Sequence, residues 1–379
     1  MRTNRSLCFA MWGRLVTRSG AWKQQVAVST GSPRAGRMAS CPASRIESHR
    51  SSPRVLFVVP GDGQGSSMIF VRRQAESLVA EDTDVNLFYL GSRTSPGQLL
   101  AELFRFRTCV ARFRPDVIHA HFGTVTALFA AFGCGTLPLV ITYRGSDLNP
   151  APASYRWRAK LRAACGRLFS QLAALRAQKI ICVSCRLRDR LWWRRGVVAI
   201  QPSGVDSDVF RPEPRLSARR RLGWSDDESV ALFHAGRDVK VKRLDLALAA
   251  VDQARRKVPS LRLEILDGSV PPSLVPSLMN AADCLLLTSF SEGSPNVVQE
   301  ALASNLPIVS VAVGDVEERL HGVDHSTVAL PDAAVLGVAL ARLVDPPRRS
   351  NGRQKIPEFC SRRLARELKE IYQELAADE

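Results

Sequence analysis

The sequence contains no run of about 18 consecutive apolar residues, the length that a helix needs to cross a lipid bilayer. We therefore expect no membrane-spanning helix. Cysteine is scattered, and Cys182-Val-Ser-Cys185 is the only pair with the CxxC spacing. Because a zinc site of this type needs a second pair, we interpret these two cysteines as small buried residues in a reducing compartment.

The sequence is also poor in acidic residues. It has 36 Asp and Glu against 53 Lys and Arg, which gives a formal net charge of +17. The excess is concentrated in two segments. Residues 1–54 carry ten Arg or Lys and a single acid, Glu47, and residues 155–179 carry seven Arg or Lys and no acid. Such clustering indicates an anionic partner, either a membrane surface or nucleic acid.

Residues 1–53 have no sustained hydrophobic period and are rich in Ser, Arg and Gly. Their composition predicts a disordered basic extension. A short apolar run, residues 6–12, is faintly like a signal peptide, but it lacks the length and ends at Gly13-Arg14. A start codon assigned upstream of the true one is an alternative explanation for this segment.

From Val55 onward, apolar strand patterns alternate with helical ones. We expect strands near residues 55–59, 85–90, 117–120, 138–143, 179–183, 197–201, 229–235, 261–266, 283–288 and 307–311. We expect helices near residues 67–80, 97–113, 123–132, 155–177, 185–194, 242–256, 296–304, 332–343 and 361–375. This alternation predicts an α/β fold with two doubly wound parallel sheets.

The boundary between the two sets falls at Pro202-Ser203-Gly204-Val205-Asp206. We therefore predict an acceptor-side domain over 54–201 and a nucleotide-sugar-binding domain over 202–345. Residues 346–379 form a tail whose last helix is expected to pack back toward the first domain.

The most constrained motif is Ser291-Glu-Gly-Ser-Pro-Asn-Val-Val-Gln-Glu-Ala301, between a strand and a helix. Pro295 suits the first helical position and Ser294 the N-cap. Free N–H groups at a helix start attract phosphate. Glu292 on the loop and Glu300 on the helix would then reach hydroxyls on either side of the phosphate, as a sugar nucleotide requires.

This motif resembles the Glu-x7-Glu segment of the family 4 retaining glycosyltransferases. The resemblance implies the GT-B fold, in which two Rossmann-like domains face each other across a cleft. It also implies that Glu292 contacts the donor sugar and Glu300 the ribose. Gly293, Asn296 and Val297 would lie against the donor.

Two further segments fit the same donor. The spacing of Arg237 and Lys242 resembles the family's diphosphate clamp, and paired cations suit a diphosphate. The loop 61–67 is glycine-rich, and we expect Gly65 within it to face the donor. A dinucleotide site is disfavoured because the spacing is GxGxG and no acid ends the second strand.

Histidines and an aspartate end two neighbouring strands of the first set. His121 follows Asp116-Val-Ile-His-Ala, and the resemblance implies that it faces the reacting sugar. We interpret His119 as a hydrogen-bonded core residue. Asp147 is a candidate for contact with sugar or acceptor. Arg144 stands where relatives often carry histidine, and it would either grip an anionic acceptor or pair with Asp147.

The two histidines have no third ligand nearby, so we predict neither a metal nor a cofactor other than the nucleoside-diphosphate sugar. The helix over 155–179 interleaves Arg and Lys with Trp157 and leucines, and Trp192-Trp-Arg-Arg195 adds a second such patch. Basic helices with aromatic residues bind anionic membrane surfaces. A nucleic-acid partner is disfavoured because no recognised binding motif is present.

Together these features predict a cytoplasmic retaining hexosyltransferase at the inner face of the membrane. Its acceptor would be a lipid-linked glycan in cell-surface polysaccharide synthesis. Two alternatives remain: a sugar-nucleotide epimerase on the same architecture and a basic nucleic-acid-binding protein without enzymatic activity.

Overall fold

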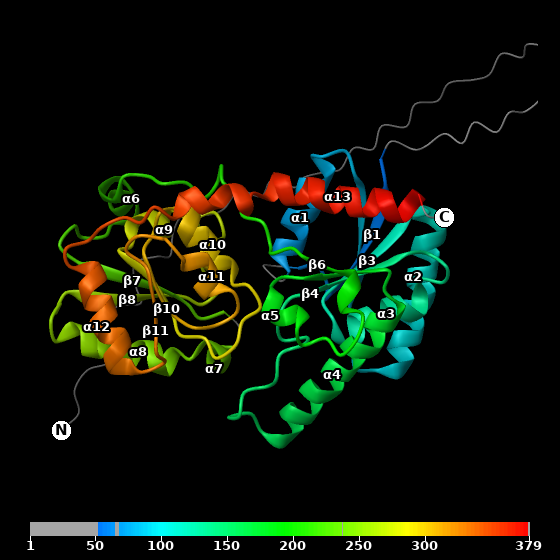
Figure 1. The fold of residues 1–379 in the computed structure, drawn as a ribbon, viewed down its shortest axis with the longest axis horizontal. Coiled ribbons are helices and arrows are strands. Elements are labelled where there is room, and N and C mark those ends of the chain that lie inside the picture. Colours follow the sequence, from blue (N-terminus) through cyan, green and yellow to red (C-terminus); the bar gives the residue numbers. More distant parts are fainter. Residues whose placement is uncertain (1–51, 65–67, 237, 378–379) are drawn as a thin grey trace, which may run out of the picture. The chain divides into compact units, whose positions relative to one another are not determined.

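The computed structural model describes residues 52–64, 68–236 and 238–377, so the expectation for residues 1–53 lies almost entirely outside the described residues. The described chain contains two sheets in which all strand pairs of the ladders are parallel (Figure 1). The first sheet has the order β2-β1-β3-β4-β5-β6. Its strands are β1 (Arg54–Pro60), β2 (Asp84–Leu90), β3 (Val117–His121), β4 (Leu139–Tyr143), β5 (Lys179–Cys182) and β6 (Val198–Ile200).

Alternation along β1 divides the core of the first sheet into two layers. Val55, Phe57 and Val59 belong to one buried cluster, whereas Leu56 and Val58 belong to another. Successive strand residues point to opposite faces, so the two clusters lie on the two faces of the sheet. Both faces are therefore covered, as a parallel sheet requires.

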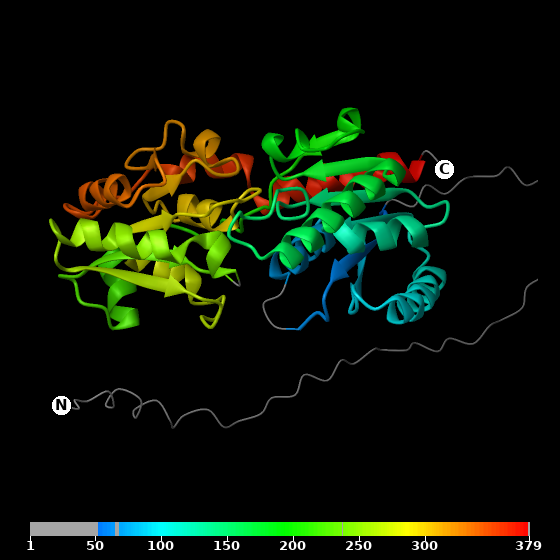
Figure 2. The same cartoon turned by 90° about the horizontal axis from the view of Figure 1, so that it is seen from below.

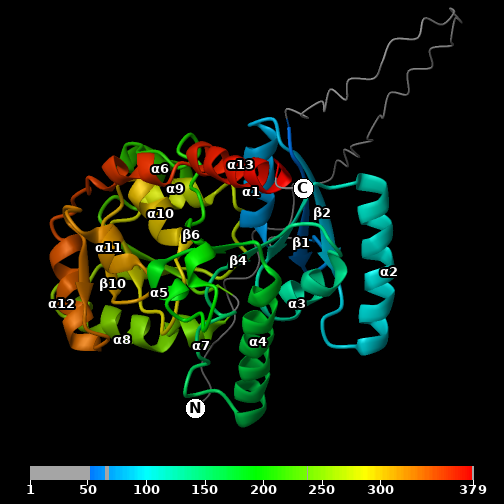
Figure 3. The ribbon, with the colours of Figure 1, turned by 45° about the vertical axis from the view of Figure 1, so that its right-hand side comes forward.

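Helices and the chain's last segment provide these covers. The first-half helices are α1 (Ile69–Val79), α2 (Pro96–Phe113), α3 (Thr124–Gly133), α4 (Trp157–Arg176) and α5 (Cys185–Arg188), with a 3₁₀ turn at Arg195–Val197. Helix α13 (Ser361–Ala377) lies beside α1, and its Leu368 and Tyr372 are buried in the same cluster as Phe57 (Figures 1 and 3).

The second sheet has the order β11-β10-β9-β7-β8. Its strands are β7 (Ser229–His234), β8 (Leu261–Leu266), β9 (Cys284–Leu287), β10 (Ile308–Val311) and β11 (Thr327–Ala329). Its helices are α6 (Arg215–Leu222), α7 (Val239–Lys242), α8 (Leu244–Arg255), α9 (Val275–Ala281), α10 (Asn296–Ala303), α11 (Val316–Leu320) and α12 (Ala333–Val344), with a 3₁₀ helix at Gly352–Glu358.

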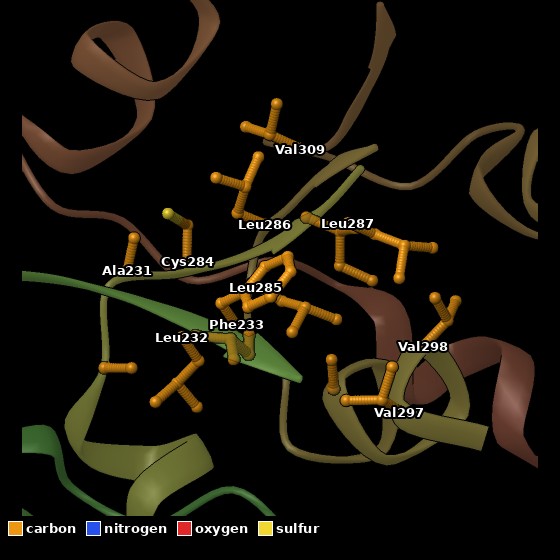
Figure 4. Close-up of a cluster of buried hydrophobic side chains, with 14 of the residues drawn as sticks. Ala231, Leu232, Phe233, Cys284, Leu285, Leu286, Leu287, Val297, Val298 and Val309 are labelled. Atoms are coloured by element: carbon orange, nitrogen blue, oxygen red, sulfur yellow. The ribbon is translucent and has the colours of Figure 1, made fainter. Parts of the chain in front are cut away.

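A single large apolar cluster forms the core around this sheet. Phe233, Leu285 and Val309 come from three adjacent strands, and Val298 brings α10 onto them (Figure 4). Helix α8 packs against α12, and α6 packs against α9. Figure 2 shows helices on both faces of this sheet.

The predicted α/β architecture with two doubly wound sheets is confirmed, and most of the expected strands and helices occur where the patterns placed them. The helix expected over 185–194 is wrong in length, because α5 ends at Arg188. The sequence did not predict α6, α7, α9, α11 or β11. No helix in the described ranges is long and apolar enough to span a bilayer. In each sheet the strand order reverses beside the first strand, and ligands of open α/β sheets bind at the carboxyl ends near that point.

Candidate active site

The loop between β9 and α10 approaches the first sheet's loops at two glycines. A Cβ on Gly293 would lie 2.0 Å from the carbonyl oxygen of Arg144, and one on Gly145 would lie 3.0 Å from the Gly293 nitrogen. Only glycine allows this approach without displacing the backbone. The side-chain amide of Asn149 donates to the carbonyl oxygen of Glu292 at 3.1 Å. The Glu292 loop is therefore held against the carboxyl end of β4.

Helix α10 begins one residue later than the sequence predicted. Pro295 is extended, with ψ at 117°, and it occupies the N-cap position, so the first helical residue is Asn296. The prediction of Ser294 as N-cap is wrong. Its hydroxyl instead accepts from Arg319 at 3.0 Å and from Gln299 at 3.2 Å. In the described chain no side chain caps the first N–H groups of α10, which leaves them available to a phosphate.

Glu292 and Lys242 form an ion pair, with 2.5 Å between Lys242 Nζ and Glu292 Oε1. Lys242 ends α7, the short helix that follows β7. His234, at the end of β7, lies close to this pair. Burial lowers the pKa of His234 to about 4, and the Lys242 charge lowers it further while Glu292 opposes the change. His234 is therefore neutral at physiological pH.

Glu300 faces a different neighbour. Its carboxylate lies 3.5 Å from Nη1 of Arg73, which comes from α1 beside the first sheet. Burial raises the pKa of Glu300 to about 7, and Arg73 opposes that rise. Arg73 is a residue that the sequence analysis missed, because nothing near it in the chain marks it as the partner of a residue more than 200 positions away.

The two histidines of β3 differ sharply in their contacts. His119 is buried and fully bonded, with Nδ1 2.6 Å from the Tyr372 hydroxyl and Nε2 2.7 Å from the Thr142 hydroxyl. His121 has its Nδ1 3.2 Å from Nη2 of Arg144, while its Nε2 has no hydrogen-bond partner among the described residues. Burial, followed by the nearby positive charges, holds the pKa of His121 well below its usual range.

Arg144 does not form an ion pair with Asp147, one of the two roles that its position suggested. Its guanidinium instead donates to His121, to Gln74 of α1 at 3.1 Å and to Ser203 at 2.8 Å. It also lies over the ring of Phe70, 4.3 Å from the centroid. Burial lowers the pKa of Arg144 to about 10, a value that still leaves the group charged at neutral pH.

Asp147 is buried and bonded to backbone. Its oxygens accept from the N–H groups of Gly123 at 3.0 Å, Arg144 at 3.0 Å and Gly145 at 2.8 Å. Burial raises the pKa of Asp147, and these bonds oppose the rise. Asp147 therefore shapes the loops after β3 and β4, and this geometry favours a positioning role over the predicted contact with a sugar.

Of the remaining predicted site residues, two are described by the structure and two are not. Val297 is buried in the second core, and Asn296 lines a hollow with Glu300, Arg73 and Gln74. That hollow measures about 470 Å³, and a smaller one of about 150 Å³ is bordered by Glu292, Asn149 and Gly314. Gly65 and Arg237 lie outside the described residues. Among the residues that are described, no group of three or more His, Cys, Asp or Glu side chains could hold a metal ion.

Two family models match the chain in order along the sequence. The model for glycosyltransferase family 4 matches residues 64–209, and the model for glycosyl transferases group 1 matches residues 264–345. The chain belongs to the family 4 glycosyltransferases, and its two sheets form the GT-B fold. Both the predicted family and the predicted fold are confirmed.

Among curated proteins the chain is similar to TuaC of Bacillus subtilis, which is named as a teichuronic acid biosynthesis glycosyltransferase. The two are 29% identical over 247 residues, which cover 60% of this chain and 61% of TuaC. The D-inositol 3-phosphate glycosyltransferase of Thermobispora bispora is 29% identical over 187 residues, covering 40% of this chain and 43% of the relative. The matched segment thus spans less than two thirds of the length of either relative.

Solved structures show the same fold at lower sequence identity. Sucrose-phosphate synthase from Thermosynechococcus elongatus superimposes with a TM-score of 0.67 and 18% identity, covering 86% of this chain and all of that one. HepE of Anabaena, solved with UDP and glucose, superimposes with a TM-score of 0.66 and 17% identity, covering 84% of this chain and 99% of that one.

Proposed function

We propose that the protein transfers a hexose-type sugar, with retention, from a nucleoside-diphosphate sugar to a glycan acceptor. The observation that carries this proposal is the arrangement around α10. An uncapped helix start, a lysine and two carboxylates eight positions apart gather at the carboxyl end of the second sheet. This set matches the phosphates, the sugar hydroxyls and the ribose of such a donor.

In this proposal the donor diphosphate lies at the start of α10, where Lys242 and Arg237 neutralise the charge that develops on the leaving group. Glu292 would then exchange its bond with Lys242 for bonds to sugar hydroxyls. Glu300 would bind the ribose, and Gly65, Gly293, Asn296 and Val297 would form the donor's walls. These four residues would contact the donor through backbone groups or uncharged side chains rather than through charge.

His121 orients the reacting sugar but cannot accept a proton in the described arrangement. Arg144 only donates, so Nδ1 of His121 must be the acceptor and Nε2 must carry the hydrogen. As the resemblance to the retaining enzymes implies, the acceptor hydroxyl would attack C1 on the face from which the leaving group departs. As the new C–O bond forms and the C1–phosphate bond breaks, the hydroxyl proton passes to the departing phosphate oxygen.

We further propose that residues 54–201 act as the acceptor domain and 202–345 as the donor domain. Residues 346–379 would tie the two together through α13. The observations in support are that β1–β6 and β7–β11 fall in separate sheets, and that α13 packs on α1.

The donor proposal is tested by calorimetric titration with UDP, GDP and ADP. HepE was solved with UDP and glucose, so UDP is the first choice. We expect one nucleotide to bind with micromolar affinity and Lys242→Met to weaken it by about tenfold or more, because a charge-assisted contact is lost. Arg93→Gln, an exposed cation of the first half, is the matched control. Absence of binding by all three nucleotides would contradict the proposal.

We propose that the acceptor is lipid-linked and that α4 brings the enzyme to an anionic membrane at the inner, cytoplasmic face. The N-terminal part of α4 extends away from α3 (Figures 1 and 3), and its apolar side chains are exposed, with Trp157 at 68%. Leu161, Leu168, Leu172 and Leu175 continue this apolar stripe. Arg156, Arg158 and Arg162, all exposed, supply charges for lipid headgroups.

Sedimentation with vesicles tests the membrane proposal. Wild-type protein should pellet with vesicles that contain about one third phosphatidylglycerol, and the triple change Arg156→Glu, Arg158→Glu, Arg162→Glu should leave it in the supernatant. The same number of changes on α13, at Arg362, Arg363 and Arg366, is the control for net charge. Equal pelleting of both triple variants would overturn the role of α4.

A sugar-nucleotide epimerase on the same architecture is the alternative activity. The UDP-GlcNAc 2-epimerase of Methanocaldococcus jannaschii shares the fold at a TM-score of 0.50 and 11% identity. Incubation with the donor alone separates the two activities, because an epimerase converts it without an acceptor.

A further inference from the structure

The guanidinium of Arg144 is a partly buried charge that forms no salt bridge with a carboxylate of the described residues. Its three hydrogen-bond acceptors are Gln74, Ser203 and His121, all neutral groups. In the described part of the chain it forms no ion pair with any acid. Asp147, the nearest candidate in sequence, uses its oxygens on backbone N–H groups instead.

Two other buried arginines of this fold differ from Arg144, because each of them is paired with a carboxylate. Arg219 is fully buried, lies 2.8 Å from Asp283 and donates to several carbonyl oxygens around it. Arg319 lies 2.6 Å from Asp315. A charge withdrawn from water is costly unless a counter-charge accompanies it. Arg144 has three neutral acceptors and the ring of Phe70 around its guanidinium but no paired carboxylate, which leaves it able to attract an anion.

Unused donors lie on both members of the Arg144–His121 pair. A guanidinium has five N–H groups, and Ser203, Gln74 and His121 take three of them. Its Nε is buried and has no partner among the described residues, and the same holds for the protonated Nε2 of the fully buried His121. Two neighbouring residues therefore present hydrogen-bond donors and one positive charge, with no acceptor opposite them.

The pair lies next to the place where the sugar would react. The carbonyl oxygen of Arg144 lies against Gly293, the residue after Glu292. Gln74 and Ser203, which hold the guanidinium, line the same hollow as Glu300. A group bound by Arg144 would consequently belong to a sugar substrate rather than to the donor diphosphate, which Lys242 serves from the other sheet.

We propose that Arg144 and His121 form a subsite for an anionic oxygen group, a carboxylate or a phosphate, carried by one of the two sugar substrates. This proposal rests on the proposed glycosyltransferase function and narrows its substrate class to acidic sugars. The charge of Arg144 supplies the attraction, and the Nε2–H group of His121 supplies direction. A neutral side chain at position 144 would leave a neutral sugar equally acceptable.

Two series of calorimetric titrations test this subsite, a donor arm and an acceptor arm, and each compares acidic ligands with a neutral one. The donor arm compares UDP-glucuronate with UDP-glucose. The acceptor arm compares glucuronate and glucose 6-phosphate with glucose, in the presence of UDP. The variants are Arg144→His, which restores the common family residue, and Arg144→Lys, which keeps the charge but removes the planar donors. Arg93→Gln controls for the loss of a cation elsewhere.

We expect the wild-type protein to bind the acidic member at least about tenfold more tightly in one arm, the factor typical of a charged hydrogen bond. Arg144→His should abolish this preference, measured as the ratio of the acidic ligand's affinity to the neutral ligand's affinity. Arg144→Lys should retain a preference of a few fold, which decides the matter if Arg144→His fails to fold. The arm that shows the effect identifies whether donor or acceptor carries the charge.

Two results would overturn the subsite: equal affinity for acidic and neutral ligands in both arms, or a preference that survives Arg144→His. Failure of UDP, GDP and ADP alike to bind would instead contradict the proposed function. The acceptor arm repeated without UDP would then still decide the subsite by the same two criteria.

Discussion

The two sheets differ in how the polar side chains at their carboxyl ends are buried and bonded. At the second sheet Lys242 and Glu292 form an ion pair whose side chains are 16% and 15% exposed. At the first sheet His121 and Asp147 are fully buried, and hydrogen bonds of Arg144 and Asp147 also determine the loop structure. Changes in the second half should therefore affect catalysis, whereas changes in the first half should also affect folding.

The largest effect that would sharpen this contrast is expected at Glu292. Glu292→Gln removes the charge that orients the donor sugar, and losses of this kind reduce kcat by about 10²–10³-fold. The melting temperature should change by only a few degrees, because the loop stays held by Asn149. Steady-state transfer assays and thermal scanning measure the two effects. A loss below fivefold would remove Glu292 from the proposed mechanism.

Asp147→Ala is the first-half counterpart. It leaves three buried N–H groups without an acceptor, so the free energy of unfolding should fall by about 3 kcal/mol. Urea titration followed by tryptophan fluorescence measures this change. Asp208→Asn breaks an exposed ion pair with Arg362 and should cost less than about 0.5 kcal/mol. Equal effects of the two substitutions on the free energy of unfolding would contradict the difference that we expect between the two halves.

Glu300 joins the two halves, and its ionisation should appear in donor binding. Its pKa is raised to about 7, so the carboxylate is largely protonated at pH 6 and ionised at pH 8. UDP affinity should therefore rise with pH across this range, by up to about fivefold. A folded pKa above the unfolded value also means that this group's contribution to stability is lost as pH rises toward 7.

Calorimetry from pH 5.5 to 8.5 tests the Glu300 prediction. The rise in UDP affinity with pH should disappear in Glu300→Gln. In Arg73→Gln it should move to higher pH, because Arg73 opposes the rise in pKa. A step that persists in Glu300→Gln would assign it to another group.

The smallest effect is expected at Tyr372 of α13. Tyr372→Phe removes the hydroxyl that bonds His119, which should lower the free energy of unfolding by about 1–2 kcal/mol. Hydrogen exchange should then be faster in α13 and β3 but unchanged in β7 and β9. Faster exchange in the second sheet as well would show that the two halves unfold together.

The sequence predicted most of the fold because its signals are local. Buried strands such as β9 are continuous apolar runs, and helices such as α8 repeat their apolar residues with a helical period. Helix α6 was missed because its sequence, Arg-Leu-Ser-Ala-Arg-Arg-Arg-Leu, reads as polar while Arg219 is in fact fully buried. Strand β11 has only three residues, too few for a detectable period.

The candidate site was predictable as a set of residues but not as a set of contacts. Glu292, Glu300 and Lys242 stand in recognisable motifs. The partners that determine their behaviour, such as Arg73 for Glu300, come from distant segments, and no local pattern marks them. The one-residue error at Ser294 has a similar origin, because Arg319 competes for the hydroxyl that the N-cap position would have used.

The position of α13 has a consequence for how the protein is made. Strands β1 to β6 are synthesised early, yet one face of β1 is buried beneath Leu368 and Tyr372. Helix α1 covers part of that face early, but on the ribosome the part beneath Leu368 and Tyr372 stays uncovered while the whole second sheet is translated. A chaperone that binds exposed apolar surface therefore has a long interval in which to act on the first half.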